Sequence, residues 1–160
     1  MKTAGERILV ALCVAAHAGC ASVTTLVHPA TEVKLTGAPP ENRVQQVWFS
    51  PLGFFERSST DPVKVCPTKR WRAEVDSQGN ATFEARTESH FVNFLSPDSA
   101  DAALESMGRH LALCAERLDG KVEHLISLDS FDAMLMSGAT LRVECRLSSA
   151  QWHCSSSVID

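Results

Sequence analysis

Six cysteines are the residues of this 160-residue chain that could do the most chemistry, because a thiolate can accept a lipid, form a disulfide or bind zinc. Cys13 and Cys20 lie near the N-terminus, and the others are dispersed through the body of the chain, at Cys66, Cys114, Cys145 and Cys154. No two of them have the tight Cys-x-x-Cys spacing of structural zinc sites. We therefore predict disulfides, with no metal and no cofactor.

A second set of residues has the types found in a hydrolase. His124, Asp129 and Ser130 lie close together in "VEHLISLDSF". No G-x-S-x-G motif accompanies them, and on a strand His124 and Ser130 would share a face from which Asp129 points away. We predict no catalytic residue, and keep a secreted or periplasmic enzyme or a small-ligand carrier as the alternative function.

The first nineteen residues are typical of a secretory signal. "MKTAGER" is charged, and "ILVALCVAA" supplies an apolar run of Ile8 to Ala16. Such a run fits a signal core of about 7 to 15 residues and is shorter than the ~20 needed to span a bilayer. Cleavage after "AHA", at Ala16 to Ala18, would release a soluble protein that begins at Gly19.

The alternative cleavage is suggested by "AGC" at Ala18, Gly19 and Cys20, which resembles the lipobox of bacterial lipoproteins. His17 departs from the aliphatic residue that this family prefers at that position. The resemblance implies that Cys20 receives a diacylglycerol thioether and an acylated amino group. In a Gram-negative cell, Ala21 in place of Asp implies transport to the outer membrane. The expected partner of the chain is then the membrane, reached through the lipid anchor.

A further likeness runs through the body of the chain. The segments "VWFSPLGFF", "DPVKVCP", "FVNFL" and "LRVEC" resemble the small Bor-type lipoproteins, which have an early cysteine and a terminal strand that ends in cysteine. This chain departs from them by a predicted helix between those segments and by lacking their glycine-rich turn. The resemblance implies no catalytic residue.

Alternation near the C-terminus predicts a hairpin and one disulfide. In "LRVECRLSSAQWHCSSSVI" the side chains of two strands alternate about a polar turn at Ser149 and Ala150. Folding the chain there sets Leu147 opposite Trp152 and Cys145 opposite Cys154. Opposed residues lie close enough for a disulfide. The pair Cys145–Cys154 leaves Cys66 to pair with Cys114.

A helix is predicted over about residues 97–119. Ser96 could serve as N-cap, Pro97 as the first helical residue and Gly120 as the stop. Apolar residues recur at spacings of three and four and include Cys114, which we expect to face the core. A bond from Cys114 to Cys66 would then fasten the helix to the earlier "VKVC" segment.

The expected fold is α+β, with an antiparallel sheet of about five or six strands, this one main amphipathic helix and two disulfides. Residues 20–42 are polar and punctuated by prolines, so we expect a lipidated cysteine followed by a flexible tether. A single globular domain follows at 43–160. "RWRAEV" and "ATFEAR" flank "DSQGN", which predicts a hairpin between them.

Phe54 and Phe55, next to Pro51 and Gly53, could lie on a loop that docks onto a partner or the membrane surface, although core packing also explains them. The net charge of −4 gives no basic patch of the kind nucleic-acid binding needs. We therefore predict a lipid-anchored protein of the bacterial cell envelope that acts as a binding or structural module.

Overall fold

Strands account for most of the described chain. The computed structural model describes residues 10–12, 21–52, 60–93, 110–128 and 139–159. Within these ranges eleven strands form three sheets, and the helical elements are the single turns η1 (Pro40–Asn42) and α1 (Pro62–Val65). The strands are β1 (Val10–Leu12), β2 (Ala21–His28), β3 (Thr31–Thr36), β4 (Val44–Pro51), β5 (Arg70–Glu74), β6 (Asn80–Phe83), β7 (Arg86–Asn93), β8 (Leu111–Arg117), β9 (Val122–Leu128), β10 (Thr140–Ser148) and β11 (Gln151–Ile159).

The expected α+β fold is wrong, because the fold is mostly β. Of the helix expected at 97–119, residues 111–117 form β8, whereas residues 94–109 lie outside the described ranges. Every residue from Leu111 to Ala115 is buried, since β8 is covered on both faces. The sequence of a strand that is buried on both faces is a continuous run of apolar residues, and its periodicity does not distinguish it from a buried helix.

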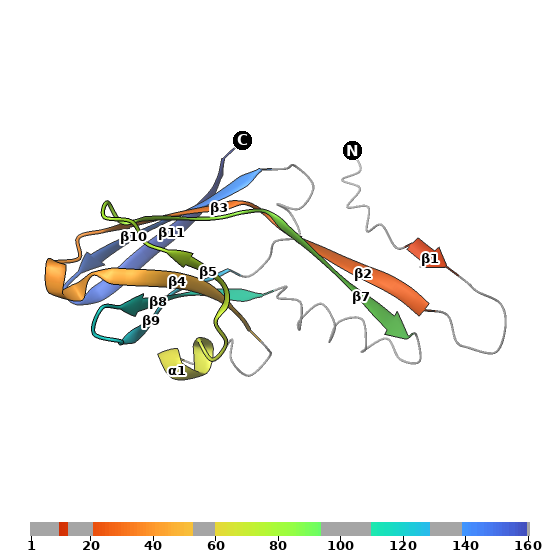
Figure 1. Ribbon diagram of the computed structural model, residues 1–160, viewed down its shortest axis with the longest axis horizontal. Helices are drawn as coiled ribbons and strands as arrows, with labels where there is room; N and C mark the ends of the chain where they lie inside the picture. Colours follow the sequence, from red (N-terminus) through yellow and green to blue (C-terminus); the bar gives the residue numbers. More distant parts are fainter. Residues whose placement is uncertain (1–9, 13–20, 53–59, 94–109, 129–138, 160) are drawn as a thin grey trace.

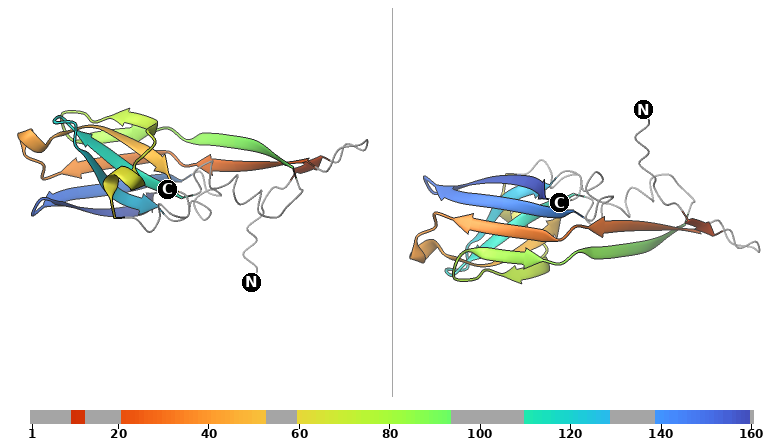
Figure 2. Two further views of the ribbon diagram at one scale, coloured as in Figure 1. Left: turned by 90° about the horizontal axis from the view of Figure 1, so that it is seen from below. Right: turned by 90° about the horizontal axis from the view of Figure 1, so that it is seen from above.

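Two four-stranded sheets form the body. The mixed sheet has the order β11-β10-β3-β6, in which β3 and β10 run parallel and the other neighbours antiparallel. The antiparallel sheet has the order β5-β4-β8-β9. Figures 1 and 2 show the two sheets as layers that lie face to face.

The main core lies between these sheets and takes alternate side chains from each strand. From the mixed sheet come residues such as Val33 and Val143, and from the antiparallel sheet come Val47 and Leu113, all at most 2% exposed. The opposite face of β4 and β8 carries a second, smaller cluster, which α1 covers. That cluster consists of Trp48, Leu52, Val65, Cys66, Ala112 and Cys114.

A two-stranded arm, β2 paired with β7, extends from the body (Figure 1). It continues the β3–β6 pair without a slip in register, since His28 lies opposite Arg86 and Thr31 opposite Phe83. The break at Pro29 follows from its missing N–H, which removes a ladder hydrogen bond. β1 pairs with β2 at Ala21 to Val23.

The expectation of a flexible tether over 20–42 therefore does not hold for residues 31–36. They form β3, an inner strand of the mixed sheet, and Val33 is 2% exposed. The segment looked like a tether because polar and apolar residues alternate in "TEVKLT", so half of its side chains face solvent.

The C-terminal hairpin has the predicted register. β10 and β11 are antiparallel, with Leu147 opposite Trp152 and Cys145 opposite Cys154. Ser149 and Ala150 both have positive φ, at 51° and 62°, as the tight two-residue turn requires.

The hairpin predicted across residues 76–80 is only half right. A turn is present, in which Gly79 donates its N–H to the Asp76 carbonyl at 3.1 Å. The strands on either side do not pair, because β5 belongs to the antiparallel sheet and β6 to the mixed sheet. The turn carries the chain from one layer to the other.

Candidate functional site

The predicted disulfides are both present, Cys66–Cys114 and Cys145–Cys154. The other predicted sites, the lipidation site Cys20 and the loop residues Phe54 and Phe55, lie outside the described residues. The pairing of Cys66 with Cys114 was predicted by elimination and supported by an expected helix, yet Cys114 lies on the strand β8. Both residues point to the outer face of the antiparallel sheet, where α1 meets β8.

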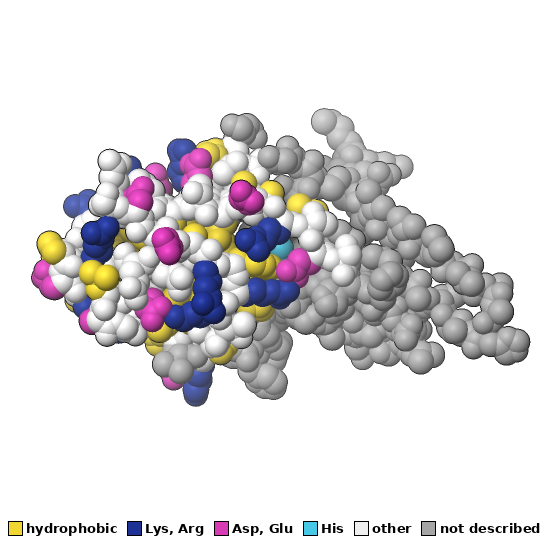
Figure 3. Space-filling view, viewed as in Figure 1, with side chains coloured by type: hydrophobic (Ala, Val, Ile, Leu, Met, Phe, Trp, Pro, Cys, Tyr) yellow, Lys and Arg dark blue, Asp and Glu magenta, His cyan; other side chains and the backbone are white. Residues whose placement is uncertain are grey.

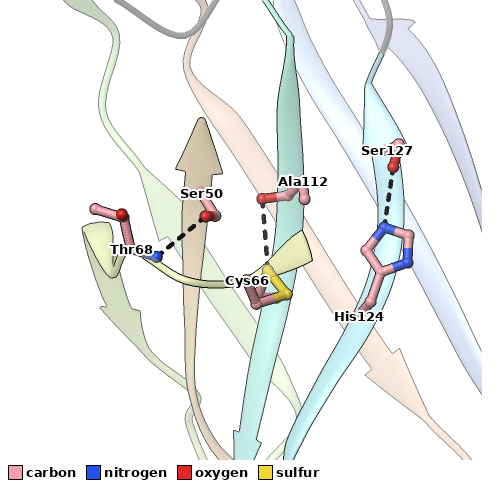
Figure 4. The surroundings of a disulfide bond; sticks show 7 residues. Ser50, Cys66, Thr68, Ala112, His124 and Ser127 are labelled. Carbon is pink, nitrogen blue, oxygen red and sulfur yellow. Dashed lines mark hydrogen bonds between the residues drawn. A yellow bond between two sulfur atoms is a disulfide. The ribbon is translucent and has the colours of Figure 1, made fainter. Parts of the chain in front are cut away.

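Figure 4 shows the surroundings of Cys66–Cys114. The Ser50 hydroxyl accepts a hydrogen bond from the Thr68 N–H at 3.3 Å, so the segment after α1 is held to β4 as well as to β8. The Cys114 Sγ lies 3.8 Å from the Ala112 carbonyl oxygen, a contact without a hydrogen bond because an oxidised sulfur carries no proton. This site is structural, since it closes the small core and offers no free thiol.

His124 lies on β9 beside the same region and pairs with a hydroxyl. Its Nε2 is 3.0 Å from the Ser127 Oγ (Figure 4). Burial disfavours the imidazolium and lowers the His124 pKa below its usual 6.5. Asp129 and Ser130 lie outside the described residues, so the triad is not assembled among those that the structure describes.

Metal-binding chemistry finds no support in the described ranges. They contain no group of three or more His, Cys, Asp and Glu side chains arranged to hold an ion. A cavity at the base of the arm, next to His28 and Trp71, has room for about one water at roughly 10 Å³. The two rings lie 4.3 Å apart between centroids and are tilted by 53° to one another.

Two open grooves lie at the end of the body away from the arm, which we call the distal end. One has a volume of about 550 Å³ and the other about 460 Å³, and Arg43 and Val75 line both. The first is completed by Gln45, Gln46, Glu74 and Leu118. The second is completed by Leu35, Thr36, Gly37, Ala38, Pro40, Val44, Asp76, Ser77, Gln78, Gly79 and Trp152.

Backbone hydrogen bonds fix the segments that line the first groove. The Leu118 N–H donates to the Arg43 carbonyl at 3.0 Å, and the Val75 N–H donates to the Gln45 carbonyl at 3.0 Å. Leu118 is 59% exposed. The arrangement leaves an apolar side chain beside the charged and amide groups of Arg43 and Gln45.

A polar network beneath the grooves ties three loops together. The Arg117 guanidinium donates to Asn42 Oδ1 and, at 2.9 Å, to Asp119 Oδ2, and lies 3.6 Å from Glu123. Glu123 also accepts a hydrogen bond of 2.7 Å from the Trp152 indole Nε1–H. Trp152 is thereby held as a wall of the second groove, and the loops of the distal end share one framework.

The loop over 76–80 forms the rim of the second groove and is organised by one carboxylate. The Asp76 side chain accepts hydrogen bonds from the N–H of Asn80 at 2.9 Å and of Gln78 at 2.8 Å. The Asn80 hydrogen bonds, from its backbone and its side chain, are the main reason that the Asp76 pKa falls below 3.8. Asp76 stays ionised and preserves the shape of the rim.

The chemistry of the distal end suits noncovalent binding. The described residues of the groove walls supply amides, one guanidinium, carboxylates and exposed apolar surface, and they include no cysteine, no histidine and one serine, Ser77. Figure 3 shows Lys and Arg side chains interspersed with Asp and Glu over the described part of one face.

Sequence reasoning did not single out this site. Position 118 falls within the helix expected over about 97–119, and Trp152 was expected only as a partner in the hairpin. The turn residues of "TGAPPENR", "DSQGN" and "LDGK" mark three separate loops in the sequence. Their meeting at one end depends on the sheet order, which local pattern does not contain.

Comparisons with known proteins give no further guidance. No protein-family model, no curated protein and no solved structure matches the chain. Among the described residues, no helix has the length and apolar character to cross a bilayer.

Proposed function

We propose that this chain is a lipid-anchored protein of the bacterial cell envelope whose β domain binds a partner at the distal end. Lipid on Cys20 would hold the chain at the membrane, and the outer membrane is its proposed location. Two acyl-bearing groups on one residue suffice for stable anchoring without a spanning helix. The four cysteines of the body form two disulfides, as is common in exported proteins.

The observation that supports the proposal is that one continuous ribbon, β2 and β3, connects the lipobox-like segment to the distal end. β2 begins at Ala21, directly after Cys20, and its ribbon runs in one register through β3 to Thr36, which lines the second groove. At about 3.3 Å per residue, these residues span roughly 50 Å. A paired ribbon of this length would hold the grooves away from the membrane, whereas a flexible linker would not.

The proposed cleavage would also remove β1. β1 lies within the expected signal segment and pairs with β2 at Ala21 to Val23. After its removal β2 would retain β7, its other partner along the whole arm. The first residues of the arm would then have one free edge close to the lipid.

The anchor is tested by the mass of the mature protein recovered from the membrane fraction. We expect a chain that begins at Cys20 and carries acyl groups, with incorporation of labelled palmitate. Cys20→Ala should abolish the label, and Cys13→Ala is the matched control, because Cys13 would leave with the signal. A lipid-free mass that begins at Gly19 would refute the anchor and favour a soluble secreted protein.

The binding role is tested at Leu118. A photo-crosslinking residue at 118, in intact cells, should give a defined adduct that Arg43→Glu diminishes, because Arg43 lines the same groove. Position 144 is the matched control, since Glu144 is exposed on β10 and lines neither groove. Equal adducts at 118 and 144 would count against a site at the distal end.

A further inference from the structure

The outer edges of the two sheets are protected to different degrees. An exposed edge strand invites pairing with another chain unless it is short, charged or bulged. β6 is four residues long, β5 contains Arg70 and Arg72, and β9 contains Glu123 and lies opposite a register shift in β8. β11 is nine residues long, pairs with β10 in continuous register and contains no Lys, Arg, Asp, Glu or Pro. It is the least protected of these edges.

The register shows which backbone groups of β11 point outward. The Cα atoms of Cys145 and Cys154 are 4.1 Å apart, the short separation of a pair that does not exchange ladder hydrogen bonds. The N–H and C=O of Cys154 therefore face away from β10, and by alternation so do those of Trp152, Ser156 and Val158. Among the described residues, no other strand pairs with this edge and no loop backbone bonds to it.

We propose that two copies of this chain join through antiparallel pairing of β11 with β11, about a two-fold axis at Ser155. The outward N–H and C=O groups belong to every second residue of β11. The axis must therefore pass through a residue and not between two residues, because only then do outward backbone groups of one copy lie opposite outward backbone groups of the other. Centring it on Ser155, the middle of the strand, uses its full length. Trp152 then lies opposite Val158 of the second copy, and Cys154 opposite Ser156 of the second copy.

The side chains are compatible with this self-pairing. Val158 is 46% exposed in a single chain, and an indole would cover it at each end of the interface. Aromatic and β-branched residues form favourable cross-strand pairs, and strands without charge avoid like-charge repulsion. Four pairs of outward residues would exchange about eight hydrogen bonds and join the two mixed sheets into one.

Ser156→Pro provides the test, because the N–H that it removes points outward and is not used by β10. Sedimentation of the whole purified protein in one nonionic detergent, over the micromolar range, should show a monomer–dimer equilibrium for the wild type. Ser156→Ala is the matched control and should leave the equilibrium unchanged. Ser156→Pro should weaken it at least about tenfold, since two interface hydrogen bonds are lost in each dimer. Unchanged thermal unfolding would show that β10–β11 is intact.

A charge exchange at Ser155 tests the register and does not depend on a proline. Two copies of Ser155→Lys would meet at the axis and weaken the dimer, and Ser155→Glu would do the same. Mixing the two variants should restore dimers that contain one of each. A wild type that is monomeric at every concentration, a dimer insensitive to Ser156→Pro, or mixtures without rescue would overturn the proposal. None of these results depends on lipid at Cys20.

Discussion

The disulfide Cys66–Cys114 should contribute more to stability than Cys145–Cys154. In the chain-entropy account, a disulfide destabilises the unfolded chain in proportion to the logarithm of the loop that it closes. The separations are 48 residues for Cys66–Cys114 and 9 for Cys145–Cys154. These loops correspond to about 4 and about 2.5 kcal/mol at 25 °C. We therefore expect a difference of about 1.5 kcal/mol between the two double-alanine variants.

The structure adds a local consequence to this difference. α1 is four residues long, too short to persist as an isolated helix, and it covers the small core through Val65, which directly precedes Cys66. Without the disulfide, α1 should open more often than the rest of the fold. Lys64, which is exposed on α1, would then become a faster site of trypsin cleavage.

The assay is urea unfolding of the wild type, Cys66→Ala/Cys114→Ala and Cys145→Ala/Cys154→Ala, with limited proteolysis in parallel. Each variant loses two sulfur atoms, so part of the packing loss cancels in the comparison. Equal losses of unfolding free energy, or a larger loss for the hairpin variant, would refute the loop-length reasoning. Unchanged cleavage at Lys64 would show that α1 is held by packing alone.

Four further predictions concern single residues. Gly79→Ala should lower the free energy of unfolding by more than about 2 kcal/mol, because at a φ of 83° the added Cβ would lie 2.2 Å from the Leu35 carbonyl oxygen. Gly120→Ala is the control, since Gly120 has a φ of 80° and nothing within 4 Å of the added Cβ, and it should lower the free energy of unfolding by about 1 kcal/mol. Because burial lowers the His124 pKa, the unfolded state binds the proton more readily than the folded state does. The contribution of His124 to the unfolding free energy should therefore be constant above pH 6.5 and fall as the pH decreases through 6.5. In denaturant titrations His124→Gln should flatten that slope, and an unchanged slope would contradict the assignment. Asp76 has a lowered pKa, so its contribution to the free energy of unfolding should be present above pH 3.8 and be lost as the pH falls through the pKa of the folded state. Acid titration of Asp76→Asn should lack this loss of stability, and a loss that persists would assign it to another group. Trp152→Phe removes the hydrogen bond to Glu123 and should cost about 1 to 2 kcal/mol in thermal or urea unfolding, whereas no loss would mean that water replaces the indole.

The parts of the fold that the sequence predicts well are those with local constraints. A two-residue turn and period-two alternation fix the whole register of β10 and β11, down to the opposition of Cys145 and Cys154. Two further strands, β4 and β9, coincide with the segments "VQQVWF" and "KVEHLISL", whose β-branched, aromatic and other apolar residues favour strands locally. In each case neighbouring residues along the chain contain the necessary information.

The helix prediction failed where burial removed the pattern. Leu111 to Ala115 are apolar on both sides because the main core takes Leu111 and Leu113 while the small core takes Ala112 and Cys114. Only the existence of a second core, built by α1 and a disulfide, explains why both faces are covered. The correct pairing of Cys66 with Cys114 followed from elimination and not from the geometry assumed for it.

The candidate site was beyond local reasoning for a related reason. Arg43, Val75 and Leu118 lie on three loops, and their proximity depends on the order β5-β4-β8-β9 and on the turn at 76–80 that changes sheets. A turn motif specifies that the chain reverses, but not which strand it pairs with next. Sheet order is set by the burial of all strands together.

The sequence by itself determined two features of this protein: the pairing of the cysteines in the body and one hairpin in a fixed register. Only the tertiary structure decided that β3 is an inner strand, that β8 is a strand buried on both faces, and that the distal loops meet around Arg43 and Val75. The physical reason is that side-chain alternation and turn geometry act over a few residues. Which strands become neighbours depends on apolar surface contributed by segments far apart in the chain.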